Sequence, residues 1–162
     1  MELGPTDRRR HGRRRGLGVL VVIVLAVVLG LLLAAYVPRT LAEGDLDGET
    51  YQVRGAPGVF APRLEVVTAE RSTDVAPDTP ASLDDTEVVM PTGGTDLTVV
   101  LGPTPRGIDS VRVDTEHGVG EAVIHRLLWR RVHVQVYEEP VDVSQLVGIG
   151  PRGEVVEVVA QQ

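Results

Sequence analysis

Residues Gly16–Val37 read GLGVLVVIVLAVVLGLLLAAYV, an apolar run of 22 residues that contains no charged side chain. As an α-helix this run would be about 33 Å long, which matches a bilayer hydrocarbon core of about 30 Å. A helix also satisfies all the backbone hydrogen bonds of a single segment in lipid. Tyr36 stands where aromatic rings favour the headgroup level, and Pro38 ends the helix. The sequence therefore predicts one transmembrane helix over residues 16–37, in contact with the lipid bilayer.

The charges on either side of this run predict its orientation. Residues 1–15 contain six Arg, whereas only Arg39 and Arg54 lie within about 20 residues after the run. The positive-inside rule then predicts a basic cytoplasmic tail over residues 1–15 and an exterior location for residues 39–162. The basic tail has no interleaved aromatic residues and adjoins the apolar run, so a nucleic-acid partner is not expected.

The sequence leaves open whether the apolar run is retained or cleaved. Small residues in Thr40-Leu41-Ala42 fit a signal-peptidase site, which would release a chain that starts at Glu43. Secretory signals have an apolar region of about 7–15 residues, so the greater length here favours a retained signal-anchor of a single-pass cell-membrane protein. There is no Cys, which excludes a lipoprotein anchor, a disulfide and a thiolate metal site.

Composition narrows the setting of the exterior part. Residues 38–162 contain ten Arg and 21 acidic residues, a net charge of −11, which argues against nucleic acid. All 16 basic residues of the chain are Arg, and Lys and Asn are absent. Because Lys and Asn have AT-rich codons, this composition indicates a GC-rich bacterial genome, and the protein is expected in a bacterial cell envelope.

The exterior sequence predicts a stalk followed by a small mainly-β domain. Residues 38–62 are punctuated by Gly and Pro and contain one weak strand, so they are predicted as a stalk. Residues 63–160 are predicted as a β-rich domain, barrel-like or sandwich-like, because short Val-rich runs alternate with turn residues. Within it, Arg63–Ala69 is a predicted strand, and residues 70–86 are a predicted mobile loop rich in Ser, Thr, Asp and Pro.

Three further parts of the domain have recognisable patterns. Hairpins are predicted for Glu87–Met90 with Leu97–Leu101, and for Leu146–Ile149 with Glu154–Val159. Val132–Tyr137 alternates clearly, with Val132, Val134 and Val136 inward and His133, Gln135 and Tyr137 outward. Residues 121–131 have a helical stripe of Val123, Ile124, Leu127 and Leu128 but lack a cap and a following Gly or Pro. They are predicted as a short helix, with an extended strand as the alternative.

No catalytic site, cofactor site or metal site is predicted from the motifs. Gly148–Gly153 matches the dinucleotide fingerprint GxGxxG, but a Val-rich strand follows where a helix is needed, which indicates a hairpin turn. His117, His125 and His133 are eight residues apart, which is neither helix-adjacent nor strand-neighbour spacing. Ordinary histidines are expected; a zinc site using these three is the alternative.

One segment combines the residue types that are enriched at binding sites. Arg126, Arg130 and Arg131 lie beside Trp129, the single Trp of the chain, in an otherwise acidic domain. These four residues are the candidate partner-binding site, and an acidic envelope protein or polymer is the expected partner. The competing hypothesis is that the arginines pair with Glu138 and Glu139 while Trp129 belongs to the core.

These observations predict a membrane-anchored, extracytoplasmic interaction or structural module of a bacterial cell envelope. The alternative is a small envelope enzyme or metal-binding module that uses His117, His125 and His133. Neither hypothesis rests on a resemblance to a known family.

Overall fold

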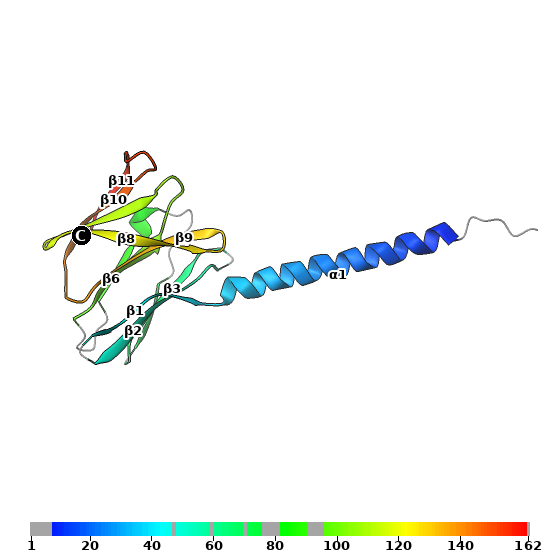
Figure 1. Ribbon diagram of the computed structural model, residues 1–162, viewed down its shortest axis with the longest axis horizontal. Helices are drawn as coiled ribbons and strands as arrows, with labels where there is room; N and C mark the ends of the chain where they lie inside the picture. Colours follow the sequence, from blue (N-terminus) through cyan, green and yellow to red (C-terminus); the bar gives the residue numbers. More distant parts are fainter. Residues whose placement is uncertain are drawn as a thin grey trace, which may run out of the picture. The chain divides into compact units, whose positions relative to one another are not determined.

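The computed structural model describes residues 8–46, 48–58, 60–69, 71–75, 82–90 and 96–161, with side chains from residue 19 onward. The chain divides into two compact units, Met1–Ala35 and Tyr36–Gln162 (Figure 1). The first consists of an apolar N-terminal helix, and the second is mainly β.

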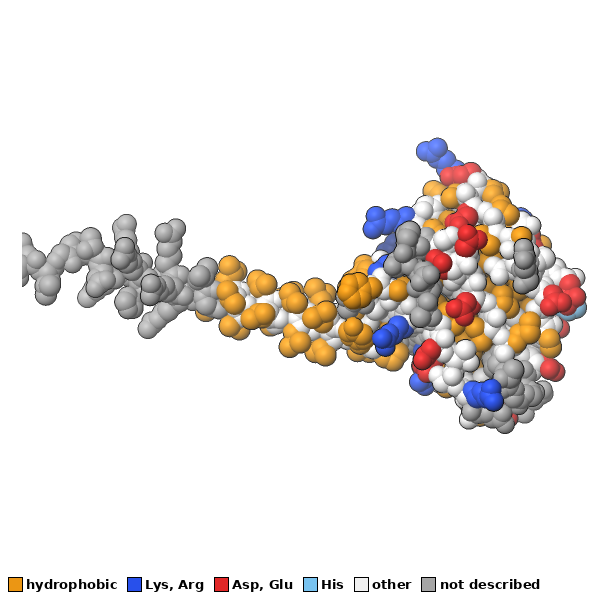
Figure 2. Space-filling model, turned by 180° about the vertical axis from the view of Figure 1, so that it is seen from behind, with side chains coloured by type: hydrophobic (Ala, Val, Ile, Leu, Met, Phe, Trp, Pro, Cys, Tyr) orange, Lys and Arg blue, Asp and Glu red, His pale blue; other side chains and the backbone are white. Residues whose placement is uncertain are grey.

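The helix α1 spans Arg8–Tyr36, so it covers most of the predicted apolar run and extends back through the basic residues. It ends at Tyr36, two residues before Pro38, whose ring fixes φ and removes a hydrogen-bond donor. Val19–Tyr36 has a mean hydropathy of 3.1 over 18 residues, and Figure 2 shows hydrophobic side chains along it. By length and composition this helix can cross a membrane; a signal sequence near the N-terminus would have the same properties.

The β unit contains two sheets. The first has four strands in the order β1-β2-β3-β4, and the second has seven in the order β11-β10-β7-β8-β9-β6-β5. All the paired strands are antiparallel. The strands and the one short 3-10 helix, η1, have these bounds: β1 Arg39–Leu46, β2 Glu49–Ala56, β3 Arg63–Val67, β4 Ser72–Val75, η1 Leu83–Asp85, β5 Glu87–Val89, β6 Thr98–Pro103, β7 Ser110–Thr115, β8 Gly118–Leu127, β9 Arg130–Tyr137, β10 Val143–Ile149 and β11 Val155–Ala160.

The larger sheet curls because the two halves of β8 pair with different neighbouring strands. Its first half, Gly118–Ala122, pairs with β7, whereas its second half, Val123–Leu127, pairs with β9. Gly120 allows a close approach at this bend, since a Cβ there would lie 2.5 Å from the hydroxyl oxygen of Tyr137. The β9–β6–β5 part therefore faces the four-stranded sheet on one side and the β7–β10–β11 part of its own sheet on the other, and a core lies on each side.

The two cores lie on opposite faces of β6 and β9. One core joins the four-stranded sheet to β6 and β9 through side chains such as Val53, Leu64 and Leu101. The other joins η1 to the curled part of the larger sheet through Leu83, Ile108 and Leu146, among others. Val99 and Leu101 of β6 belong to the first core and Val100 to the second, and all six residues of β6 are buried.

Residues 38–62 differ from the predicted stalk. They contain β1 and β2, and β2 pairs with β3 along Gln52–Ala56. Tyr51 and Val53 are buried in the first core, and Leu41 packs against it. The sequence looked stalk-like because β1 is an edge strand with mixed polarity, and edge strands are stabilised by the neighbour that they pair with rather than by their own pattern.

Residues 121–131 do not form the predicted short helix. They form the end of β8, a two-residue turn and the start of β9, with Leu127 opposite Arg130. The apparent helical stripe arises because its four apolar residues do not share one face of the strand: Val123 and Leu128 are exposed, whereas Leu127 and Ile124 are not. Leu127 packs into the first core and Ile124 against the second, so apolar residues do not alternate with period two.

The remaining predictions have mixed outcomes. Both hairpins are confirmed, as β5 with β6 and β10 with β11, and Leu64 and Val66 share the buried face of β3. The predicted mobile loop 70–86 instead contains β4 and η1, while its residues 70 and 76–81, and residues 91–95 between the strands of the first predicted hairpin, lie outside the described residues. The prediction that His133 points outward is wrong. Its side chain is fully buried.

Candidate functional site

The β8–β9 turn presents two large apolar side chains to solvent. Leu128 and Trp129 are the two central residues of this hairpin, and they are 40% and 54% exposed. Trp129 is thus not a core residue, contrary to the competing hypothesis from the sequence. We refer to Leu128 and Trp129 together as the hairpin tip.

The backbone of the hairpin tip is strained at Leu128. A two-residue hairpin loop needs a positive φ at its first central position, where Gly is the usual residue. Leu128 has a φ of 53°, and it is the single non-glycine residue with positive φ in the described part of the chain. A left-handed conformation costs an L-residue about 1–2 kcal/mol, so an exposed leucine is unfavourable here for the fold itself.

The predicted arginines surround the tip on both faces of the hairpin. Arg126 and Arg131 lie directly opposite each other on β8 and β9. Arg131 forms an ion pair of 3.8 Å with Asp109, and Arg126 is exposed. Arg130 lies on the other face and donates a hydrogen bond to the backbone carbonyl of Phe60. The structure therefore brings all four predicted site residues together.

The acidic partners that the sequence suggested for these arginines are placed elsewhere. The described residues show no ion pair between the arginines and Glu138 or Glu139. Glu138 is instead a neighbour of Tyr51, and burial together with the Glu138 carboxylate raises the pKa of the Tyr51 hydroxyl. Among the described residues Arg131 alone of the three has an acidic partner, Asp109, so no carboxylate is paired with Arg126 or Arg130.

Phe60 is a site residue that sequence reasoning missed. It is 83% exposed, and its carbonyl accepts the hydrogen bond from Arg130. It lies in the connection between β2 and β3, which the sequence assigned to a stalk. The only signal in the sequence was a lone Phe in a Gly- and Pro-rich stretch, which gives no reason to place it near Arg130.

The three histidines are not brought together. His117 is exposed in the β7–β8 turn beside Glu116, His125 lies in the second half of β8, and His133 is buried in β9. Burial lowers the pKa of His125. Among the described residues, no group of three or more His, Cys, Asp or Glu side chains is arranged to hold a metal ion.

His133 has a structural environment. Its Nε2 lies 3.1 Å from the Thr86 hydroxyl and its Nδ1 lies 3.3 Å from the Thr104 hydroxyl. A hydroxyl can donate or accept, so both nitrogens of a neutral imidazole are satisfied. Burial lowers the pKa of His133 to about 4, which keeps it neutral near pH 7.

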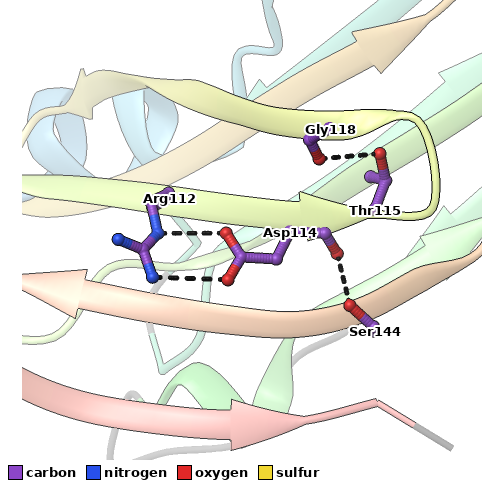
Figure 3. Close-up of polar contacts among 5 residues, drawn as sticks. All are labelled: Arg112, Asp114, Thr115, Gly118 and Ser144. Carbon is purple, nitrogen blue, oxygen red and sulfur yellow. Dashed lines mark hydrogen bonds and ion pairs between the residues drawn. The ribbon is translucent and has the colours of Figure 1, made fainter.

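A small hollow lies between β7 and β8, away from the hairpin tip. Its volume is about 240 Å³, and it is lined by Ser110, Arg112, Val119, Gly120, Glu121 and Ile149. Arg112 is already engaged, because its Nε and Nη2 donate to the two carboxylate oxygens of Asp114 at 3.0 and 3.3 Å (Figure 3). Ser144 in turn donates to the Asp114 carbonyl, which joins β7 to β10. These contacts stabilise the sheet and assemble no nucleophile with a base.

The GxGxxG sequence is a hairpin turn, as predicted. Gly148 and Ile149 end β10, and β11 begins at Val155. The Gly153 N–H donates to the Gly150 carbonyl at 3.0 Å, which closes the turn. A strand follows, so the helix N-terminus that a dinucleotide pyrophosphate needs is missing from this described segment.

Comparison with known proteins finds no matching family model, no similar curated protein and no similar solved structure. The helix and the hairpin tip are therefore the two features from which a function can be inferred.

The positive φ of Leu128 predicts that Gly is more stabilising than Ala at this position. The Leu128→Gly variant should be about 1 kcal/mol more stable than Leu128→Ala, because Gly adopts positive φ without steric cost. At Trp129, which is not among the positive-φ residues, Ala should be at least as stable as Gly. Denaturant unfolding followed by circular dichroism compares the four variants. Equal stability of the two Leu128 variants would contradict the strained turn.

Burial of His133 predicts a loss of stability in acid. The pKa is about 4 in the folded chain and near 6.5 when unfolded, so the unfolded state binds the proton first as the pH falls. Between pH 6.5 and 4 this group should therefore lower the free energy of unfolding by about 3 kcal/mol. The His133→Gln variant should show a flatter dependence in urea titrations over this range, and His117→Gln should not. An unchanged slope in His133→Gln would show that His133 is not the group responsible.

Proposed function

We propose that this chain is a membrane-anchored, extracytoplasmic interaction or structural module of a bacterial cell envelope. Residues 16–37 are the anchor, residues 1–15 are a cytoplasmic tail and the β unit is the exterior part. The observation that carries the proposal is the sequence of α1 after Arg15, which has no polar face at all. A helix that is apolar all round needs an apolar environment on every side.

The position of β1 supports a retained anchor over a cleaved signal. Cleavage after Ala42 would remove the first four residues of β1, which begins at Arg39. Arg39 and Thr40 pair with Gly55 and Arg54, and Leu41 and Ala42 pack against the first core. A chain that starts at Glu43 would lose these contacts, so the apolar helix and the β unit are better suited to remain joined.

The hairpin tip is the surface through which we propose that the module acts. Its exposed Leu128 and Trp129 lie beside Arg126, Arg130 and Arg131, and Trp and Arg are enriched at binding hot spots. The surrounding domain has a net charge of −11, so this surface is suited to a partner with negative charge. An acidic envelope protein or polymer, as expected from the sequence, has that charge. The separate placement of the three histidines gives no support to the enzyme or metal alternative.

Topology tests this proposal. A reporter that is active only outside the cytoplasm should function when it is fused after Gln162, and the full-length chain should stay in the membrane fraction. Replacing Arg8–Arg10 and Arg13–Arg15 with Glu should weaken or invert insertion, because these residues supply the positive-inside bias. The matched control replaces Arg106 and Arg152 with Glu and should keep the orientation. Soluble material that begins at Glu43 would contradict the anchor.

A further inference from the structure

Contacts within the β unit determine where Tyr36, its first residue, lies. Tyr36, the last residue of α1, belongs to the same compact unit as the strands. The guanidinium carbon of Arg63, the first residue of β3, lies 5.7 Å from the centre of the Tyr36 ring. This distance is that of a cation–π contact, so Tyr36 lies beside the start of β3 within the β unit.

The hairpin tip lies at the same end of the β unit as Tyr36. Leu41, two residues into β1, and Leu127, which precedes the tip, both approach Gly55; a Cβ there would lie 2.8 and 2.9 Å from their methyl carbons. The hydrogen bond from Arg130 to Phe60 connects the tip to the segment just before Arg63. In Figure 1 the start of β1 and the turn between β8 and β9 accordingly lie at one end of the β unit.

This end of the β unit combines exposed large apolar or aromatic side chains with arginines. The first kind comprises Tyr36, Val37, Phe60, Leu128 and Trp129, which are all 40% exposed or more. Arg39, Arg63 and Arg126 are also exposed here, and Arg130 and Arg131 are partly buried beside them. Elsewhere acidic side chains are spread over the face seen in Figure 2.

We propose that the hairpin tip, with Phe60 and the arginines around it, docks into the phospholipid headgroup layer of the membrane that holds α1. This inference rests on the anchor of the proposed function, and it assigns the surface to phospholipid headgroups in place of an acidic protein or polymer. Tyr36 marks the level of the headgroups if the apolar run spans the hydrocarbon core, and the tip belongs to the same end of the unit. Trp and Tyr favour that level, and guanidinium groups bind phosphate in a bidentate geometry.

The strain at Leu128 fits this occupant. A glycine would serve the turn better, so the exposed leucine is useful only where its side chain meets an apolar environment. Just below the headgroups, Leu128 and Trp129 reach such an environment while the arginines remain at the phosphates. The acidic remainder of the domain is repelled by an anionic surface, so docking at the tip also sets how the domain faces outward.

Trp129 is the single Trp of the chain, so its fluorescence reports directly on the tip. The experiment uses the full chain reconstituted in vesicles of phosphatidylcholine, with or without phosphatidylglycerol. We expect emission shifted to shorter wavelength, quenching by lipids brominated near the headgroup and protection from aqueous iodide. Quenching should be stronger with phosphatidylglycerol, since each arginine near an anionic surface favours the docked state about fivefold.

Three variants separate docking from folding. Arg126→Glu places an acid on an exposed position of β8 and should reduce quenching by brominated lipid, whereas Arg152→Glu in the β10–β11 turn should not. The β signal in circular dichroism should be unchanged in both. Leu128→Asp should weaken the quenching further, because a carboxylate does not enter the apolar layer.

The outcomes distinguish the two proposals. If alkaline carbonate extracts the chain from the vesicles, the anchor of the proposed function is wrong. If the chain resists extraction but Trp129 stays open to iodide and is not quenched by brominated lipid, the docking is wrong. An acidic protein or polymer that protects Trp129 from iodide in that second case would identify a different partner for the same surface.

Discussion

The fold depends on one constraint, which is that β6 and β9 are covered on both faces. Every residue of β6 is buried, and its odd and even positions enter different cores. A polar side chain buried on such a strand pair is costly unless it is hydrogen-bonded. The Thr98 hydroxyl therefore accepts from the Val141 N–H at 3.1 Å, and His133 lies between the hydroxyls of Thr86 and Thr104. These contacts also hold η1 and the β6–β7 connection against the sheet.

The same constraint explains which parts of the fold the sequence could predict. Hairpins with Gly- and Pro-rich turns were visible because their turn chemistry is local, and Leu64 and Val66 showed one buried face. In β8, Ile124 and Leu127 pack against different cores while Val123 is exposed, so its apolar residues do not alternate and resemble a helical pattern. His133 was predicted outward for a related reason, since alternation assumes that one face of the strand meets water. The edge strand β1 does not stand out in the sequence, because its stability comes from pairing with β2 and not from a strand pattern of its own.

The candidate site was predictable in part. Trp129 and its neighbouring arginines stood out by composition, and the structure gathers them at one turn. Leu128 and Phe60 did not stand out, because their role depends on a positive φ and on a hydrogen bond across 70 residues of sequence. The curl of β8 and the two cores beneath it hold this turn at the end of the unit where α1 ends. In the proposed function, the anchor holds the β unit at the membrane and the hairpin tip is the surface that makes contact there.

The central role of β6 and β9 is tested most directly by amide hydrogen exchange on the full chain, resolved along the strands. We expect Val99–Leu101 of β6 and Val132–Val134 of β9 to exchange most slowly, at the rate of global unfolding, because they are fully buried or nearly so. The edge strand β11, with Val155, Val156 and Val158 exposed, should exchange faster. Exchange in β6 and β9 as fast as in β11 would contradict the conclusion that this strand pair is the centre of the fold.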